Sequence, residues 1–344
     1  MIIDGREYRS VCWEYGRLRM IDQNRIPQDF TIMEFSDHLQ VAEAIRNMNV
    51  RGAPAIGAAG AFALALAAKN APDQRFRAQI RQARDLLIAT RPTAVDLQSG
   101  VNYVYEQTLK FIPDLVHARK VALLAAREFA NRGAEDCRLI GEQGLPLIPD
   151  GARILTHCNA GALATVDWGT ALAVVRLAHR KGKNIFVYVS ETRPRHQGSK
   201  ITAWELAQEG IPHAIIADSA SGYYFWRGEI DVVITGADRV CLNGDIANKI
   251  GTYDKAVLAS HHEIPLYVAA PLSTFDFSCQ QGSDIPIEFR DEEELKLYGG
   301  QLTANPSSPA MNPGFDITPA ALIQGIITPR GVFAAAEAAQ KVQG

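Results

Sequence analysis

The stretch Arg153-Ile-Leu-Thr156-His-Cys-Asn-Ala-Gly161 decides the fold class of this chain. An apolar run that ends in a turn of small residues is typical of a buried strand. Further runs of this kind occur at 184–190, 214–217, 232–235 and 265–269. Helical segments are expected between them, at 162–181 and 202–209. Strands that alternate with crossover helices predict a parallel, doubly wound, Rossmann-like sheet.

The residues that precede this stretch have a different pattern of apolar residues. Apolar residues at three- and four-residue spacing predict helices at 38–48, 54–68, 78–89 and 117–132, after a short β meander. The segment 144–151 carries two prolines and two glycines, which is typical of a junction. We therefore predict an α/β protein with a mainly helical N-terminal domain at 1–145 and a Rossmann-like catalytic domain at 146–344.

Composition and charge restrict the class of function. The formal net charge of -3 gives no strong basic field for nucleic acid, so no nucleic-acid partner is expected. The N-terminus lacks the pattern of a signal peptide, and Pro54 and glycines interrupt the longest apolar stretch, so no membrane partner is expected either. The 5 cysteines are widely spaced without a Cys-x-x-Cys pair, which favours reduced thiols in a cytoplasmic protein.

Polar residues follow four of the expected strands. The first strand is followed by His157-Cys-Asn159, the second by Ser190-Glu-Thr-Arg193, the third by Asp218-Ser219, and the fourth by Gly236-Ala-Asp-Arg239. Ligands of open parallel sheets bind beyond the carboxyl ends of the strands. These residues therefore predict a ligand site at one edge of the sheet.

No cofactor is expected at this edge. The first turn reads Asn159-Ala-Gly-Ala-Leu-Ala164 and lacks the Gly-x-Gly-x-x-Gly fingerprint of a dinucleotide site. Such a turn, where it enters a helix, can offer backbone N–H groups to an anion, or it can be a close turn without a ligand. No metal is expected, because His-x-x-x-His and Glu-x-x-His spacings are missing.

Two residues at the strand ends are candidates for chemistry. Cys158, at a strand end and beside a helix N-terminus, could be a reactive thiolate, although a lone cysteine is more often a small buried hydrophobe. Asp238 could exchange protons if partly desolvated, although an aspartate after Gly236-Ala237 also suits an Asx-type turn or a helix cap.

Three cationic groups stand beside turns. Arg51 precedes a glycine and a proline-started helix, Arg91 precedes Pro92-Thr93, and Asn248-Lys249 follows a glycine-containing loop. Arginine forks suit phosphate oxygens and lysine adds a point charge, whereas each residue alone could be a solvated surface charge.

The chain resembles the methylthioribose-1-phosphate isomerase family over nearly its whole length. That family shares a superfamily with regulatory subunits of a translation-initiation exchange factor and with ribose-1,5-bisphosphate isomerase. Four long motifs in the same order carry the resemblance: Arg51-Gly-Ala-Pro-Ala-Ile-Gly57, Thr156-His-Cys-Asn-Ala-Gly-Ala-Leu-Ala-Thr165, Glu191-Thr-Arg-Pro-Arg-His-Gln-Gly198 and Gly236-Ala-Asp-Arg-Val-Cys-Leu-Asn-Gly-Asp-Ile-Ala-Asn-Lys-Ile-Gly-Thr-Tyr253.

The resemblance implies a cytoplasmic homodimer of methionine salvage that isomerises 5-methylthioribose 1-phosphate without metal or organic cofactor. It implies an active site in the interdomain cleft, with Cys158 and Asp238 as the catalytic pair. By the same motifs, the contacts to the sugar phosphate are Arg51, Gly52, Ala53, Arg91, Gln197, Asn248 and Lys249.

Several positions depart from the family pattern, namely Phe275, Phe289, Gly314 and the loop 304–313. They leave the 5-substituent open, and 5-deoxyribose 1-phosphate or another ribose 1-phosphate would need the same catalytic residues. A non-catalytic regulatory member of the superfamily is the alternative from another class.

Overall fold

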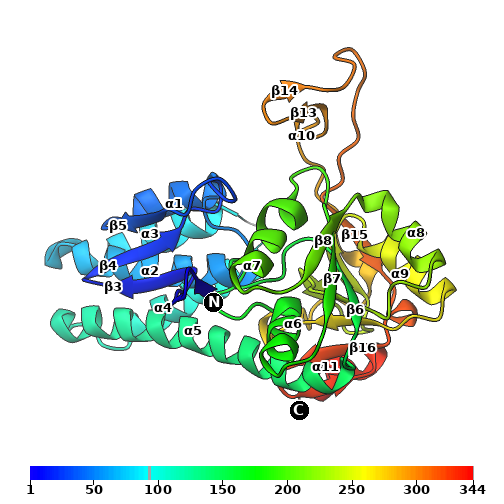
Figure 1. Cartoon of the computed structure of the whole chain (residues 1–344). Coiled ribbons are helices and arrows are strands. Elements are labelled where there is room, and N and C mark those ends of the chain that lie inside the picture. Colours follow the sequence, from blue (N-terminus) through cyan, green and yellow to red (C-terminus); the bar gives the residue numbers. More distant parts are fainter. Residues whose placement is uncertain (92–93, 344) are drawn as a thin grey trace. The chain divides into compact units, whose positions relative to one another are not determined.

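The computed structural model describes residues 1–91 and 94–343 (Figure 1). The chain divides into two compact units. The N-terminal unit comprises Met1–Arg138 and Gly161–Gly169, and the C-terminal unit comprises Leu139–Ala160 and Thr170–Gly344. Among the described residues, no helix has the length and apolar character needed to cross a membrane.

Helices and short antiparallel strands build the N-terminal unit. The strands are β1 (Ile2–Ile3) with β2 (Arg6–Glu7), and β3 (Val11–Glu14), β4 (Arg17–Ile21) and β5 (Ile32–Phe35) in a second sheet. The helices are α1 (His38–Arg46), α2 (Ala53–Asn70), α3 (Phe76–Ala89), α4 (Val95–Leu109) and α5 (Leu115–Gly144), whose last turns belong to the other unit.

Helix α2 forms the centre of the N-terminal unit. Its residues 55–68 are all buried, as expected for a helix that is apolar on every side. Helix α4 packs closely on it, and a Cβ atom added at Gly100 would stand 2.3 Å from the carbonyl oxygen of Gly57. Small residues at this contact therefore allow the two backbones to approach. Helix α4 was not expected from the sequence.

The segment 161–169 belongs to the N-terminal unit and is not helical. This corrects the expected helix at 162–181, because α6 begins only at Ala171. Trp168 and Gly169 have φ of 67° and 85°, which a right-handed helix does not accommodate. The segment instead pairs within the unit, where Ser10 N–H donates to Val166 O at 3.0 Å and Ala55 N–H to Ala164 O at 3.2 Å.

A 7-stranded sheet organises the C-terminal unit, in the order β17-β16-β12-β9-β6-β7-β8. All neighbouring pairs are parallel except β16 and β17, which confirms the α/β, Rossmann-like fold. The strands are β6 (Arg153–Thr156), β7 (Phe186–Ser190), β8 (His213–Ile216), β9 (Val232–Thr235), β12 (Leu266–Ala269), β16 (Gly325–Thr328) and β17 (Gly331–Phe333).

Alternate residues of these strands face two separate apolar clusters, as the two-residue period of a strand requires. Ile154 and Ile234 join the cluster with α6 (Ala171–Arg180) and α7 (Ala203–Gln208). Leu155 and Val233 join the cluster that includes α8 (Ser221–Trp226), α9 (Thr252–His261) and α11 (Ala335–Gln343). The sheet is thus covered on both faces.

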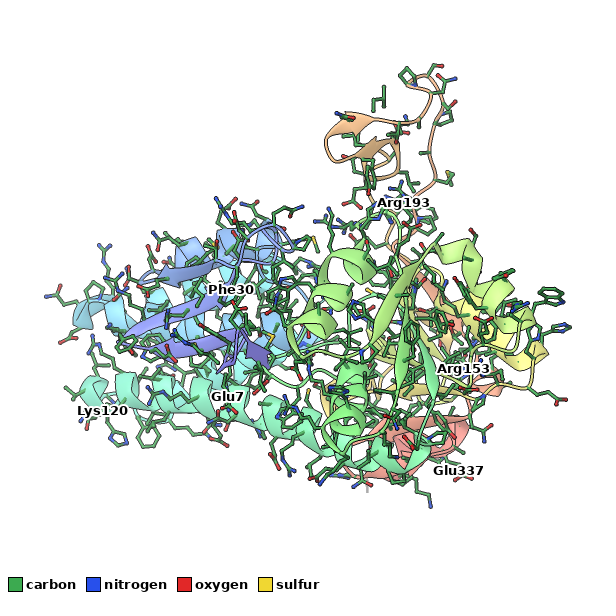
Figure 2. The ribbon with its side chains drawn as sticks, in the orientation of Figure 1. Glu7, Phe30, Lys120, Arg153, Arg193 and Glu337 are labelled. Atoms are coloured by element: carbon green, nitrogen blue, oxygen red, sulfur yellow. The ribbon has the colours of Figure 1, made fainter. Side chains whose placement is uncertain are left out.

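Two smaller sheets complete the C-terminal unit. The strands β10 (Arg239–Val240), β11 (Ile246–Lys249) and β15 (Phe315–Thr318) form one, and β13 (Leu297–Tyr298) and β14 (Gln301–Leu302) form the other. β13 and β14 follow α10 (Glu293–Lys296) on a segment that projects from the unit (Figure 1). Arg193, labelled at the base of this segment in Figure 2, donates to Leu295 O at 2.9 Å.

Candidate active site

The order of the sheet places a switch point between β6 and β9. From β6 the chain proceeds through β7 to β8 on one side, and β9 then pairs on the other side of β6. Open parallel sheets bind ligands at such a point, beyond the strand ends. Cys158 follows β6 and Asp238 follows β9, so the two candidate catalytic residues belong to the strands that flank the switch point.

The loops after these two strands lie against each other. A Cβ atom at Gly236 would stand 3.0 Å from the Cβ of Ala160, so a larger residue there would separate the loops. Thr156 Oγ1 also donates to Ile234 O at 2.9 Å between the two strands. The structure therefore brings the Cys158 and Asp238 loops together at one edge.

Cys158 is half-buried and has a left-handed backbone, with φ of 62°. Such a conformation is costly for a non-glycine residue and persists only where its surroundings hold it. Two threonine hydroxyls do so. Cys158 N–H donates to Thr192 Oγ1 at 2.9 Å, and Thr202 Oγ1 donates to Cys158 O at 2.7 Å. The helix N-terminus expected beside Cys158 is not there, because α6 starts at Ala171. A helix N-terminus directly after Cys158 therefore neither activates the thiol nor binds the phosphate.

Asp218 fixes the turn that carries Thr192. Its carboxylate accepts from Ser190 Oγ at 2.6 Å, Thr192 N–H at 2.8 Å and Arg193 N–H at 2.7 Å. Burial alone would raise the pKa of Asp218, but these hydrogen bonds outweigh it and leave the pKa below its usual value. An ionised Asp218 thus holds the residue that holds Cys158.

His157, next to Cys158, is a buried neutral imidazole. Its Nε2 lies 2.8 Å from Ile250 O, and because a carbonyl only accepts, Nε2 carries the proton. Burial, and next the charge of Lys255, lower the pKa of His157 to about 3. His157 therefore supports the strand end in its neutral form.

Asp238 directly precedes the antiparallel hairpin of β10 and β11, in which Arg239 pairs with Ala247. Asp238 N–H donates to Ala247 O at 2.9 Å, so Asp238 is held next to the strand that contains Asn248, an expected substrate contact. The side chain of Asp238 is exposed, whereas the expected acid role calls for a dry site.

The other expected contacts in this unit have different surroundings. Gln197 is buried, and within the part of the chain that the structure describes its Oε1 has no hydrogen-bond partner. Asn248 Nδ2 donates to Thr252 Oγ1 at 2.9 Å. Lys249 Nζ donates to Gly314 O at 2.9 Å and stands 4.6 Å from the centre of the Phe315 ring. Gln197 thus offers an acceptor to a ligand hydroxyl.

Four expected contacts belong to the N-terminal unit. Arg51 is buried, and Gly52 has φ of 92° before Ala53 begins α2. Arg91 is half-buried, while Pro92 and Thr93, which follow it, lie outside the described residues.

One buried ionic group behind the site was missed in the sequence. Arg176 pairs with Glu205 and, at 2.7 Å, with Glu209, and the side chains of all three are at most 4% exposed. Asn159 Nδ2 donates to Glu205 Oε1 at 2.9 Å, so the group also fixes the residue after Cys158. The sequence indicated this group only through charged residues, Arg176 and Glu205, within otherwise apolar stretches of two expected helices.

The departures from the family pattern are distributed over the C-terminal unit. Phe275 is 6% exposed and packs in a core cluster, whereas Phe289 is 62% exposed and pairs with Pro313 in an isolated bridge. The loop 304–313 follows β14. Gly314 supplies the carbonyl that accepts from Lys249.

The fold defines a doubly wound α/β protein with its switch point between β6 and β9. The model of the Initiation factor 2 subunit family matches residues 49–335. A methylthioribose-1-phosphate isomerase of Desulforamulus reducens is 46% identical over 328 residues, 94% of each chain. One from Roseiflexus sp. is 48% identical over 335 residues, 95% of this chain and 94% of its own.

Solved structures agree with these relatives. 5-Methylthioribose 1-phosphate isomerase from Pyrococcus horikoshii matches with a TM-score of 0.93 and 41% identity, over 98% of this chain and 95% of its own. The translation initiation factor eIF-2B, subunit delta, from A. fulgidus matches with a TM-score of 0.90 and 42% identity, over 98% and 99%. The chain belongs to the Initiation factor 2 subunit family and, within it, to the methylthioribose-1-phosphate isomerases.

Proposed function

We propose that the chain isomerises 5-methylthioribose 1-phosphate to 5-methylthioribulose 1-phosphate, with Cys158 and Asp238 as the catalytic pair. The isomerase relatives support the reaction. The placement of Cys158 and Asp238 after β6 and β9, on either side of the switch point, is the observation that supports these two residues. The chain is accordingly an aldose–ketose isomerase of methionine salvage.

The substrate sets the chemical problem. Its anomeric oxygen carries the phosphate, so the ring cannot open spontaneously to a free aldehyde. Asp238 as the acid protonates the ring oxygen while the bond from C1 to that oxygen breaks. Hydrogen then moves from C2 to C1, either as a proton through an enediol with the Cys158 thiolate as base, or as a hydride while the C2 hydroxyl loses its proton. Since Asp238 is exposed, the bound sugar must itself exclude water from this carboxyl.

The phosphate and the sugar hydroxyls need fixed partners. We assign the unpartnered Gln197 Oε1 to a sugar hydroxyl and Asn248 and Lys249 to the polar end of the substrate. Arg51, Gly52, Ala53 and Arg91 of the N-terminal unit are assigned to the phosphate. Arginine forks and a helix that begins at Ala53 suit a phosphate dianion.

The working form is proposed to be a cytoplasmic homodimer. β8 is an edge strand on which Ile215 is 52% exposed, and Trp226 of α8 is 72% exposed. An apolar edge of this kind is normally covered, and a second copy would cover it. Sedimentation of wild type and Trp226→Glu tests this, with a dimer expected for wild type and dissociation for the variant.

A proton NMR assay in D₂O tests the reaction. Purified chain receives 5-methylthioribose 1-phosphate and, in parallel, 5-deoxyribose 1-phosphate. Loss of the anomeric signal with formation of a ketose establishes turnover, and the ratio of rates names the substrate. Deuterium at C1 of the product indicates proton transfer, and its absence indicates a hydride shift. A folded chain that turns over neither sugar would support the regulatory alternative, which the likeness to the initiation factor subunit favours.

A further inference from the structure

Two cysteines outside the catalytic pair meet in the C-terminal unit. The Sγ atoms of Cys241 and Cys279 lie 2.9 Å apart, and the two residues are 0% and 8% exposed. Cys241 directly follows β10, and Cys279 lies in the chain after β12. The two positions are 38 apart in the sequence, which had given no reason to pair them.

The backbone around the two sulfurs is already fixed. Leu242 N–H donates to Cys279 O at 2.9 Å, and Asp276 N–H donates to Val240 O at 2.9 Å. These bonds lie on either side of Cys241 and hold its segment against the turn that contains Cys279. Arg239 adds an ion pair to Asp276 at 3.2 Å.

We propose that Cys241 and Cys279 form an intrachain disulfide. The oxidant is a small disulfide such as oxidised glutathione. One thiolate attacks it and releases one reduced glutathione, and the second thiolate then attacks the mixed disulfide and releases the other. The chain loses two protons and two electrons, and the oxidant is reduced to two thiols.

The surroundings make this bond slow to exchange and hard to reduce. Burial, and next the neighbouring thiol of Cys279, raise the pKa of Cys241 well above its usual value. Because thiolates are the attacking species, exchange in the folded chain is slow. Because the backbone already holds the two sulfurs in contact, little conformational entropy is lost when the bond forms. This favours the disulfide over the two thiols in the presence of a glutathione pool. All five cysteines are free thiols in the structure, as the sequence predicts, and the proposed oxidation would leave three of them reduced.

The bond would cross-link the hairpin of the active site. β10 starts directly after Asp238, and β11 ends at Asn248 and Lys249. The link from Cys241 to Cys279 ties this hairpin to the chain after β12. It would therefore hold the site without touching the substrate.

Peptide mapping tests the proposal. The full chain is equilibrated with oxidised glutathione in two arms, once as purified and once during refolding from urea, so that slow access to buried sulfur cannot hide the bond. Free thiols are then alkylated and the chain is cut with trypsin without reductant. We expect peptides 240–249 and 256–290 to be recovered as one species that separates on reduction. Alkylated Cys241 and Cys279 in both arms would overturn the proposal.

A thermal measurement gives a second readout. Reduction of the oxidised wild type should lower Tm by about 5 °C, because the denatured chain regains freedom. The Cys279→Ser variant is the control, since it keeps a small polar side chain but cannot form the bond. Its Tm should not respond to reductant. An equal shift in the variant would assign the effect to another thiol and contradict the proposal.

Discussion

The backbone N–H of Cys158 donates to Oγ1 of Thr192 across 2.9 Å, and both residues have left-handed backbones, with φ of 62° and 64°. Each strained residue is thus tied to the other. Asp218 anchors Thr192 in turn through its backbone N–H at 2.8 Å. The direction in which Cys158 presents its sulfur depends on this chain of contacts.

Thr192→Val should reduce kcat while the chain stays folded. Valine keeps the β-branched shape but leaves the Cys158 N–H without an acceptor, at a cost of about 1–3 kcal/mol. If this free energy is added to the activation barrier of the reaction, kcat falls roughly 5- to 150-fold. Steady-state kinetics measure it, and Thr192→Ser, which retains the hydroxyl, is the control. Wild-type kcat in the valine variant would show that the hydrogen bond does not position Cys158.

Cys158→Ser and Asp238→Asn should each lower turnover by about 100-fold or more, because each removes a proton-transferring group. Both residues are partly or fully exposed to solvent, so little stability should be lost. Turnover by NMR and Tm are measured together, with the half-buried Cys12→Ser as control. If both variants fail to fold, the two residues are needed for the structure and not for catalysis.

Arg51→Ala should mainly raise KM. The loss of a charge-assisted contact to phosphate costs about 1.5–3 kcal/mol, which corresponds to a roughly 10- to 150-fold increase. The exposed Arg25, which pairs with Asp29, provides the matched control Arg25→Ala. A KM that does not change in a folded Arg51 variant would remove this residue from the binding site.

His157 should make the folded state acid-sensitive. Its pKa is lowered from 6.5 to about 3, first by burial and then by the charge of Lys255. Between these values the unfolded chain binds a proton that the folded chain does not. The free energy of unfolding therefore falls as pH drops from about 6.5, by up to about 1.4 kcal/mol per pH unit from this group.

Urea titrations across that pH range compare the wild type with His157→Gln. The variant should have the shallower dependence on pH, whereas the exposed His117→Gln should keep the wild-type slope. Equal slopes in all three chains would mean that His157 is protonated in the folded state.

Arg176→Met should destabilise the chain by about 3–5 kcal/mol, because it leaves Glu205 and Glu209 buried without their cation. Arg180, whose side chain is 34% exposed, also pairs with Glu209, and Arg180→Ala should cost at most about 1 kcal/mol. Denaturant unfolding of both variants checks the difference. Equal losses would show that burial does not decide the strength of this ionic group.

The sequence predicted the strands of the site well because their signal is local. β6 and β9 begin and end where the apolar runs at 153–156 and 232–235 do. Helix α4 was missed because Gly100, serine and β-branched residues weaken its helical signal, although Leu97, Val101, Val104 and Thr108 keep the spacing of a buried face. β16 was also missed, since a four-residue apolar run near the end of the chain has little context.

The site could be predicted only in part. Cys158 and Asp238 could be predicted because reactive residue types follow two of the expected strands. Gln197 was predicted only from the family motifs, because no sequence spacing indicates a binding role for it. The left-handed backbone of Cys158 and the hydroxyl groups that hold it depend on turns between strands distant in sequence. The course of residues 161–169 likewise depends on Ser10 and Ala55, which lie more than a hundred positions earlier.

That same segment affects how the chain is made. The N-terminal unit needs Val166, Leu163 and Ala164 as partners for Ser10, Gln23 and Ala55. A ribosome delivers these residues only after it has made α5 and β6. The N-terminal unit can therefore be completed only after residue 169 has been made, and a nascent chain that stops near residue 145 would expose surfaces that only its later part can cover.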